Sequence, residues 1–536
     1  MPADNFKITY TTTNSPANLA AMNDGFDAAI AQHRTKLHQE FSPVIGYGKK
    51  VAAWGHLDSI NPSNTSEMLH RFGSFPVSAL DEMVSLAMNA QRSWGAESWQ
   101  NRVAVVRRAA AVIRERKMQL AAAVCLEVGK NRFESLGDVE EAADLLDYYA
   151  AQVESCDGYF SKLMSLLPGE ETGSFLRPYG VFAVIAPFNF PMALAAGMAG
   201  AALLGGNSVI LKPSEDTPWT GELLLGVMGD AGIPEGLFQV CQGPGDTVGA
   251  ALVAHRDISG VAFTGSVKTG MAIHRKCASG RWIKPCLMEL GGKNGAIIMP
   301  SANIDAAVEG CIKSAFGLSG QKCSALSRII VHHDIKREFT ARLLEFAATW
   351  KVGDATARDC NLGPVINAAS VVRGERALAL AKTRGGKILY RHETCSAGMN
   401  VNVDGNLDAA SGHYVMPVIA ELDPNHELMR QELFLPFAGL TTCHSLDEAL
   451  GILNNTDFGL TAGVFSNEDT EILQFFDEAE AGVLYANRKT GATTGAWPGV
   501  QSFCGWKASG ASGKGGCGPH YVAQFMREQS RTRMRG

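Results

Sequence analysis

The sequence predicts an α/β protein with two parallel-sheet domains in series. The first observation is a rhythm of short apolar stretches alternating with longer helical ones, which runs from residue 181 to about 290 and resumes from 294 to 488. Such strand–helix repeats form a parallel sheet with helices on both faces. The second observation is the length, because 536 residues exceed what one hydrophobic core usually organises.

The part of the chain before residue 156 is helical in pattern. A helix is expected from 78 to about 94, because Ser78 and Asp81 have the spacing of a capping box. A longer helix is predicted over 101–128, where apolar residues recur on one stripe, and a third over 138–153. The first forty residues carry no pattern that predicts an element.

An uncharged segment at 181–206 is long enough to span a bilayer. Pro187, Asn189 and Pro191 interrupt it, however, after a β-rich start and before a stretch of small, helix-forming residues. The segment therefore predicts a buried strand, a tight loop and a buried helix rather than a membrane span.

The remaining elements follow the same alternation in two runs. In the first run, strands are predicted at 208–212, 237–243, 260–266 and 286–292, with one intervening helix starting at Thr217-Pro218 and ending near Gly232, and another from about Asp246. In the second run, strands are predicted at 294–299, 328–333, 414–422, 436–442, 461–466 and 482–488, with helices ending near Phe316, over 336–350, over 446–455 and before 482.

Composition excludes several classes of protein. The chain has 48 Lys+Arg against 54 Asp+Glu, a net charge of −6, and no basic block of the kind that binds nucleic acid. Its 12 cysteines are scattered, with neither a C-x-x-C pair nor a His/Cys cluster at zinc spacing, so neither a disulfide scaffold nor a metal site is expected. The start lacks a signal-peptide pattern. We expect a cytoplasmic protein that contacts no membrane.

Two glycine-containing loops could approach a phosphate. GPGDTVG at 243–249 has the spacing G-x-G-x-x-x-G, one residue longer than the dinucleotide fingerprint, and is interpreted as a structural loop. FTGSVKTG at 263–270 closes a strand and opens a helix, so its backbone N–H groups from Ser266 onward could face an anion. By itself this pattern fits a phosphate site and an ordinary helix cap equally well.

Two further motifs carry reactive side chains. ELGGKN, which begins at Glu289, places a carboxylate beside two glycines at a strand end. GQKCSALSR places Cys323 in a loop beside Lys322 and hydroxyl side chains, where a thiolate could be exposed and stabilised by the positive charge. Most free cysteines are inert packing residues, so Cys323 alone would not predict catalysis.

Taken together and in order, the motifs PFNFPMA, LKPSE, FTGS, ELGGKN, GQKCS and QELFLP resemble the NAD(P)-dependent aldehyde dehydrogenase superfamily. The spacing from Glu289 to Cys323 is also similar to that of the family. PFNF, the segment 129–150 and the late NR…TGA…GPHY pattern most resemble the 1-pyrroline-5-carboxylate (L-glutamate γ-semialdehyde) dehydrogenases. The resemblance implies an aldehyde dehydrogenase-like fold, with two Rossmann-like domains and a small β extension for oligomerisation.

The resemblance assigns the reaction to three residues. Cys323 would attack the aldehyde carbon, and the side-chain amide of Asn189 would hold the oxyanion together with the Cys323 backbone N–H. Hydride transfer to NAD would leave a thioester, which a water activated by Glu289 would hydrolyse. In proline catabolism this converts L-glutamate γ-semialdehyde to L-glutamate.

Cofactor and substrate residues are implied in the same way. The cofactor set comprises Lys212 and Glu215 at the adenosine ribose, Ser266 at the pyrophosphate, Thr264, Gly265 and Gly291 near the nicotinamide, and Glu432 and Phe434 at its ribose. A carboxylate at Glu215 would repel a 2′-phosphate, so NAD is favoured over NADP. The substrate set comprises Ser324, Gly495, Ala496, Phe190 and Phe503.

Departures from the family pattern leave the aldehyde open. Leu435 stands where a glycine is usual, the TGA tripeptide occurs twice in 490–496, and Trp497 stands where a small aliphatic residue is expected. The alternatives are a dehydrogenase for another semialdehyde, or for an aliphatic or aromatic aldehyde. A catalytically silent scaffold and a CoA-acylating enzyme are disfavoured, because Cys323, Glu289 and Asn189 are all present.

The implied organisation has three parts. An NAD-binding domain would comprise 1–155 and 179–290, and a catalytic domain 291–488. An oligomerisation extension would comprise 156–178 and 489–536 and include the substrate-anchor loop, giving a homodimer or higher homo-oligomer.

Overall fold

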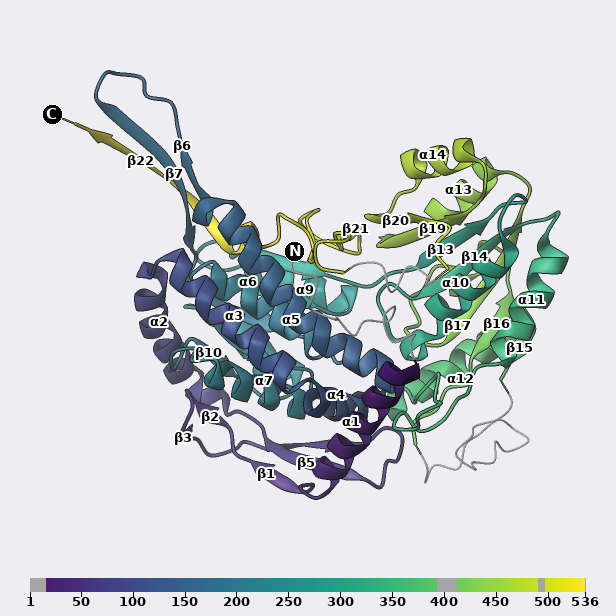
Figure 1. Ribbon diagram of the computed structural model, residues 1–536, viewed down its shortest axis with the longest axis horizontal. Coiled ribbons are helices and arrows are strands. Elements are labelled where there is room, and N and C mark those ends of the chain that lie inside the picture. Colours follow the sequence, from purple (N-terminus) through teal and green to yellow (C-terminus); the bar gives the residue numbers. More distant parts are fainter. Residues whose placement is uncertain (1–15, 393–411, 490–496, 536) are drawn as a thin grey trace.

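The computed structural model describes residues 16–392, 412–489 and 497–535 (Figure 1). Within them two large sheets lie in separate lobes, and a narrow β arm projects from the lobe that contains the N-terminal helices (Figure 1). In these residues no helix combines the length and the apolar character needed to cross a membrane.

The first sheet is five-stranded and parallel, as predicted. Its order is β10 (Phe238–Val240), β9 (Ser208–Lys212), β8 (Val181–Ile185), β11 (Gly260–Thr264) and β12 (Cys286–Glu289). Alternate residues of β8 enter two different cores, because successive side chains of a strand point to opposite faces. Phe182 and Val184 pack with the helices of one face, and Val181 and Ala183 with those of the other.

Helices cover both faces of this sheet. One face carries α3 (Trp99–Glu115), α5 (Arg132–Ser155), α6 (Ala193–Leu204) and α7 (Pro218–Asp230), with α4 (Lys117–Val128) beyond them. The other carries α2 (Leu80–Ala96), α8 (Ala250–Ala254) and α9 (Val267–Ala278). The expected strand, loop and buried helix at 181–206 are confirmed by β8 and α6.

The second sheet has seven strands. Its order is β15 (Lys387–Arg391), β16 (Val418–Glu421), β17 (Phe437–Cys443), β14 (Leu326–His332), β13 (Asn294–Ile298), β19 (Thr461–Phe465) and β20 (Val483–Ala486). All pairs are parallel except β15 with β16. Its helices are α10 (Ile304–Phe316), α11 (Lys336–Ala348), α12 (Ala368–Thr383), α13 (Leu446–Asn454) and α14 (Asp469–Glu478). The sequence pattern predicted neither β15 nor α12.

Smaller sheets complete the molecule. The arm is formed by β22 (Met526–Met534), β7 (Glu170–Pro178) and β6 (Phe160–Lys162), all antiparallel. The others are β1 (Gln39–Phe41) with β5 (Met68–Gly73) and β4 (His56–Ile60), β2 (Val44–Ile45) with β3 (Lys49–Lys50), and β18 (Phe458–Gly459) with β21 (Trp506–Lys507).

Two local expectations were wrong, and one segment for which nothing was predicted contains a helix. The capping box at Ser78 does not form, because a 3-10 turn at Val77–Ala79 precedes α2 and no side chain caps that helix. The helix expected over 101–128 is two helices, α3 and α4, separated at Arg116. The first forty residues are not devoid of structure, since α1 (Pro16–Arg34) packs against α4 and buries Phe26 completely.

The N-terminus of α7 is capped by a distant carboxylate instead of by Thr217. The Thr217 hydroxyl makes no capping bond, whereas Glu127, at the end of α4, accepts hydrogen bonds from the backbone N–H groups of Trp219 and Thr220, both at 2.8 Å. It also accepts the hydroxyls of Thr220 and Ser59, at 2.6 and 2.7 Å. A carboxylate at a helix N-terminus is stabilised by the helix dipole.

We expect Glu127→Ala to lower the free energy of unfolding by at least about 3 kcal/mol, because it leaves several buried donors without an acceptor. Glu127→Gln, which keeps one acceptor oxygen, should cost less. Thermal and urea unfolding of the two variants beside the wild type measure the difference. Equal stability of all three proteins would show that water replaces the carboxylate at no cost.

Candidate active site

The loop that carries Cys323 is held in an unusual backbone conformation. It follows α10 through a 3-10 turn in which Leu318 and Ser319 have φ angles of 49° and 54°. Left-handed backbone at residues other than glycine persists only where the surroundings enforce it. Here Glu134 accepts the backbone N–H of Leu318 at 3.0 Å, and the Ser319 hydroxyl donates to the carbonyl of Gly363 at 2.6 Å.

Two backbone carbonyl groups of the Cys323 loop are bound by Asn294, the first residue of β13. The side-chain amide of Asn294 donates to the backbone carbonyls of Cys323 and Ala325, at 2.7 and 2.9 Å. A Cβ atom on Gly292 would lie 2.3 Å from the Cys323 carbonyl oxygen, so this close approach requires glycine. Gly292 of ELGGKN therefore lets the two predicted catalytic segments touch.

Lys322 does not supply the positive charge expected beside the thiol. Its ammonium nitrogen lies 2.9 Å from Glu134 Oε1 in an almost completely buried ion pair. Loss of hydration, together with the negative charges of Glu432 and Glu289, raises the pKa of Cys323 to about 12. This environment disfavours the thiolate, and the stabilisation expected from Lys322 is directed to Glu134 instead.

Asn189 lies against the same loop. It is buried in the turn between β8 and α6, and its side-chain amide donates to the carbonyl of Gln321 at 2.8 Å. An amide nitrogen carries two hydrogens, so this bond orients Asn189 and leaves a second donor. The structure thus brings together the two residues expected to act on the oxyanion.

Glu289 is the last residue of β12. Its Oε1 accepts the backbone N–H of Gly516 at 2.7 Å. Burial nevertheless raises the pKa of this carboxyl to about 7, because loss of hydration disfavours the charged form. A carboxyl with a pKa near neutrality can exchange protons under ordinary conditions, as a general base requires.

Cys323 and Glu289 line one narrow cavity of about 70 Å³, and Asn189 lies behind the cysteine loop, outside the cavity lining. Of the residues predicted for catalysis and substrate, Glu289, Cys323, Ser324, Phe190 and Phe503 line it. Gly495 and Ala496 lie outside the described residues. Trp497 also lines the cavity, and its indole N–H donates to Asp144 at 2.7 Å.

The cavity contains a second carboxyl that the sequence interpretation missed. Glu141, on α5, lines it together with Tyr149 and Cys517. Burial, reinforced by the charge of Asp138, raises the pKa of Glu141 to about 8. The signal was present in the sequence, since acidic residues recur at helical spacing along an otherwise apolar face of α5.

One face of α5 supports the whole site. Glu134 binds the cysteine loop, and Asp138 accepts the backbone N–H of Ala193 at the start of α6, at 2.8 Å. Asp138 also forms a fully buried ion pair with Lys130 at 3.1 Å, and the Lys130 ammonium lies 3.5 Å from the centre of the Phe190 ring. Tyr149 accepts the backbone N–H of Cys517 at 3.1 Å.

A separate groove of about 870 Å³ lies between β8, β9 and α9. Lys212 and Glu215 line it, as do the loop at 243–249 and the first turn of α9. The glycine loop interpreted as structural is therefore a wall of this groove. Gly249 lies close to the Lys212 side chain, since a Cβ there would approach Lys212 Cδ to 3.3 Å.

In the FTGS segment the structure confirms the helix cap, one of the two alternatives left open by its sequence. Ser266 caps α9, because its hydroxyl oxygen accepts the N–H of Thr269 at 3.3 Å. The helix N-terminus with its remaining N–H groups still borders the groove through Lys268 and Thr269. Thr264 ends β11 and Gly265 begins the turn that leads to this cap.

The segment that contains Glu432 and Phe434 contacts the glycine pair Gly291–Gly292 through the Glu432 carboxylate. Glu432 Oε1 accepts the backbone N–H of Gly292 at 2.9 Å, and a Cβ on Gly291 would approach its carboxylate to 2.3 Å. Phe434 has a φ of 58° and its ring meets Phe188 edge-on. Leu435, the departure from the family pattern, is buried in the core beside α12.

Comparisons with known proteins agree with this geometry. A model of the aldehyde dehydrogenase family matches residues 50–530. The 1-pyrroline-5-carboxylate dehydrogenase of Geobacillus sp. (strain WCH70) is 33% identical over 520 residues, which cover 96% of this chain and 97% of that protein.

Solved structures confirm the predicted fold. The 1-pyrroline-5-carboxylate dehydrogenase from Thermus with bound NAD has a TM-score of 0.91 at 30% identity, covering 100% of this chain and 99% of that chain. Lactaldehyde dehydrogenase from Escherichia coli has a TM-score of 0.84 at 27% identity, covering 93% and 100%. The fold, the arrangement of Cys323, Glu289 and Asn189, and the near full-length match lead to one conclusion: the chain belongs to the aldehyde dehydrogenase family.

Proposed function

We propose that the protein oxidises L-glutamate γ-semialdehyde to L-glutamate with NAD. The observation that carries the proposal is the composition of the catalytic cavity, where Cys323 and Glu289 meet a serine, Ser324, and a second carboxyl, Glu141. This substrate has an aldehyde at one end and a carboxylate and an ammonium at the other. The relatives named 1-pyrroline-5-carboxylate dehydrogenase support the choice.

Cys323 acts as the nucleophile. Its thiol proton passes to solvent as the sulfur forms its bond to the aldehyde carbon and the carbonyl π electrons move onto the oxygen. The negative charge that forms on the aldehyde oxygen is held by the free N–H of the Asn189 amide and by the Cys323 backbone N–H. Each such donor contributes roughly 3–4 kcal/mol in comparable acyl chemistry.

The cofactor is held by the groove and by the loops around the glycine pair. We assign Lys212 and Glu215 to the adenosine ribose, Ser266 and the start of α9 to the pyrophosphate, and Thr264, Gly265, Gly291, Glu432 and Phe434 to the nicotinamide end. The fit rests on the size of the groove and on the helix N-terminus beside it. When bound, NAD supplies the hydride acceptor. A carboxylate at Glu215 favours NAD over NADP.

Glu289 completes the reaction. With a pKa of about 7, its carboxylate takes a proton from the water that hydrolyses the acyl group on Cys323. The hydrogen bond from the Gly516 N–H orients the carboxylate. The C–S bond breaks, the proton on Glu289 passes to the departing Cys323 sulfur, and the released acid ionises in solution.

The α-carboxylate and the α-ammonium of the substrate are bound by different residues. Ser324, with the backbone N–H groups of Gly495 and Ala496, binds the α-carboxylate, while Phe190 and Phe503 enclose the carbon chain. Glu141 binds the α-ammonium, which explains a carboxyl in a cavity that otherwise disfavours charge. An ammonium beside it stabilises its ionised form.

We expect Glu141→Gln to raise the KM for L-glutamate γ-semialdehyde about 10–100-fold, because one charge-assisted hydrogen bond is weakened. Glutarate semialdehyde, which lacks the amino group, is the matched substrate, and its KM should change little. Steady-state NADH formation gives both values. An equal loss for both substrates would contradict ammonium binding by Glu141.

The direct test of the proposed function is a panel of aldehydes assayed by NADH formation. L-Glutamate γ-semialdehyde should have the highest kcat/KM. Glutarate semialdehyde, succinate semialdehyde and unsubstituted aliphatic or aromatic aldehydes should all be poorer substrates. The other candidate, a dehydrogenase for a different aldehyde, is favoured by Trp497, which fills part of the cavity wall. Higher efficiency with an aldehyde that lacks the carboxylate would support that candidate instead.

The proposal also covers the domain boundaries and the oligomeric state of the protein. Residues 1–155 and 179–290 form the NAD-binding domain, 291–488 the catalytic domain, and 156–178 with 489–536 the oligomerisation extension. The arm exposes Met164 and Leu166, which are 93% and 89% accessible, beside Leu167, and apolar side chains so exposed favour a partner surface. A homodimer or larger homo-oligomer is expected, and light scattering after size exclusion measures it.

A further inference from the structure

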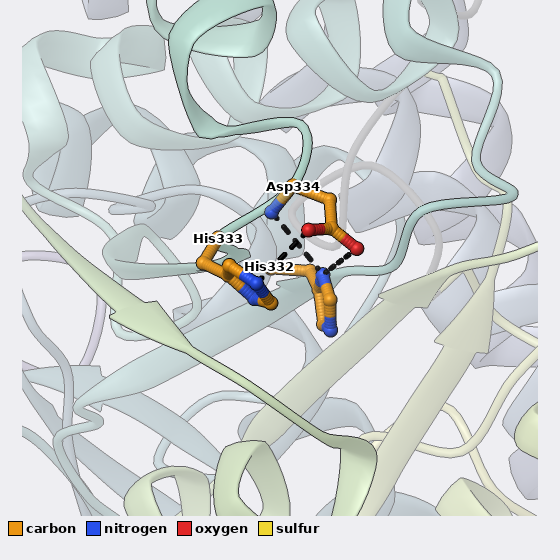
Figure 2. Close-up of side chains that lie close together, drawn as sticks. All are labelled: His332, His333 and Asp334. Carbon is orange, nitrogen blue, oxygen red and sulfur yellow. Dashed lines mark hydrogen bonds and ion pairs between the residues drawn. The ribbon is translucent and has the colours of Figure 1, made fainter.

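Three side chains at the carboxyl end of β14 form a cluster that the proposed reaction does not use. His332, His333 and Asp334 each offer one ligand atom, and these atoms lie within 4.8 Å of one another. No other group of three or more His, Cys, Asp or Glu meets this criterion in the described part of the chain. The cluster lies in the turn that leads to α11 (Figure 2). The seven-residue strand β14, roughly 20 Å long, separates it from the Cys323 loop.

The proton on His332 is placed by its surroundings. Nε2 lies 2.9 Å from the backbone carbonyl oxygen of His444, which can only accept, so Nε2 carries the hydrogen. Nδ1 of the neutral ring therefore presents a lone pair. A hydrogen bond from a second nitrogen to a backbone carbonyl is the usual way in which a ligating histidine is oriented.

That lone pair faces a carboxylate. Nδ1 of His332 lies 3.5 Å from Asp334 Oδ2, and it accepts the Asp334 backbone N–H across a long 3.4 Å. Two groups that both offer lone pairs repel each other unless a cation lies between them. The separation is close to the roughly 3.3–3.4 Å between neighbouring ligands of a tetrahedral zinc ion with bonds of about 2.0–2.1 Å.

His333 brings a third ligand atom to the same place. Its Nε2 lies 2.9 Å from Asp334 Oδ1, so one carboxylate is adjacent to both imidazoles (Figure 2). His444, in the turn between β17 and α13, packs against His333 with ring centres 4.5 Å apart and ring planes tilted by 44°. It is thus within reach as a further ligand after a side-chain rotation, and a water molecule could complete the coordination.

We propose that His332 Nδ1, His333 Nε2 and the Asp334 carboxylate bind a divalent transition metal ion of the Zn²⁺, Co²⁺, Ni²⁺ or Cu²⁺ class. Two imidazoles and one carboxylate suit these ions, whereas Mg²⁺ and Ca²⁺ prefer oxygen ligands alone. Because His332 is buried at the end of a central strand and bonded to the β17–α13 turn, the ion would fasten that turn to the strand. The site is structural or regulatory and lies apart from the catalytic cavity.

The test uses Co²⁺ with untagged full-length protein carrying Cys323→Ala, which removes the most accessible competing thiol in the cavity. Co²⁺ absorption distinguishes nitrogen and oxygen ligands from cysteine thiolates, whose charge-transfer bands are intense. We expect one Co²⁺ per chain without those bands, and at least a tenfold weaker affinity in His333→Ala and in Asp334→Asn. His56→Ala, which removes an exposed imidazole on β4, is the matched control and should bind as the parent does.

Zinc-dependent thermal stabilisation gives a second measurement. The melting temperature of the parent should rise with micromolar Zn²⁺, and that rise should disappear in the two variants while their metal-free melting temperatures stay close to that of the parent. The proposal is overturned if no metal binds at these concentrations, because a proton on His332 would then suffice to pair it with Asp334. It is equally overturned if His333→Ala and Asp334→Asn bind Co²⁺ unchanged.

Discussion

Replacing Cys323 with alanine is expected to abolish aldehyde oxidation, with kcat lower by at least about 10⁴-fold. Cys517 also lines the cavity, but Cys323 is the thiol on the loop that Asn189, Asn294 and Glu134 hold in place. Removing a nucleophile eliminates the covalent step, and losses of about a millionfold are known for comparable enzymes. Steady-state NADH formation measures the loss.

Cofactor binding should survive this substitution, since the groove formed by Lys212, Glu215 and α9 does not include Cys323. Quenching of protein fluorescence by NADH measures that binding. Cys156→Ala, which removes an exposed cysteine at the end of α5, is the matched control and should retain full activity. Turnover by Cys323→Ala at more than a small fraction of the parental rate would exclude the covalent mechanism.

Glu289→Gln is expected to separate the two halves of the reaction. The oxidative half does not need a base at this position, so the first turnover should release about one NADH per active site as a burst. Hydrolysis of the acyl group then lacks its base, and the following steady-state rate should be about 10²–10⁴-fold lower. Stopped-flow absorbance records both phases. A normal steady-state rate would show that another group activates water.

The pH dependence checks the same residue. The reactive form of Glu289 is the carboxylate, and burial places its pKa at about 7. Activity should therefore be full above pH 7 and should fall as the pH decreases through 7. Glu222→Gln, which alters a carboxyl on α7 whose pKa burial also raises, should leave the profile unchanged. A profile that stays flat down to pH 5 would contradict the role of Glu289.

The alternation of strands and helices was sufficient to predict the two large sheets, because buried parallel strands are continuous apolar runs. The pattern did not predict β15, which is a half-buried, partly polar antiparallel edge strand, or α1, whose apolar stripe is short. The split between α3 and α4 at Arg116 was also missed, since no glycine or proline marks it. Local sequence propensity does not predict elements and boundaries that are determined by tertiary contacts.

The residues of the candidate site also fall into two groups: those that sequence motifs could identify and those that only the folded structure revealed. Motif order identified Cys323, Glu289 and Asn189, because these side chains act directly and their neighbours are distinctive. The partner of Lys322 could not be inferred, since Glu134 lies far away in the sequence and only folding brings them together. For the same reason the cap that Glu127 provides became visible only in three dimensions, whereas the helical spacing of acidic residues in α5 was a signal for Glu141 that the interpretation overlooked. Long-range electrostatics leaves no local spacing to recognise.

Helix α5 links the stability of the fold to the integrity of the catalytic centre. Because it packs on α6 in one lobe while Glu134 bonds to a loop of the other, its melting would release both at once. Loss of catalytic competence and global unfolding should then follow one cooperative transition. Deleting a single residue within α5 would rotate everything after it by about 100°, so this helix should tolerate exchanges of side chains far better than changes of length.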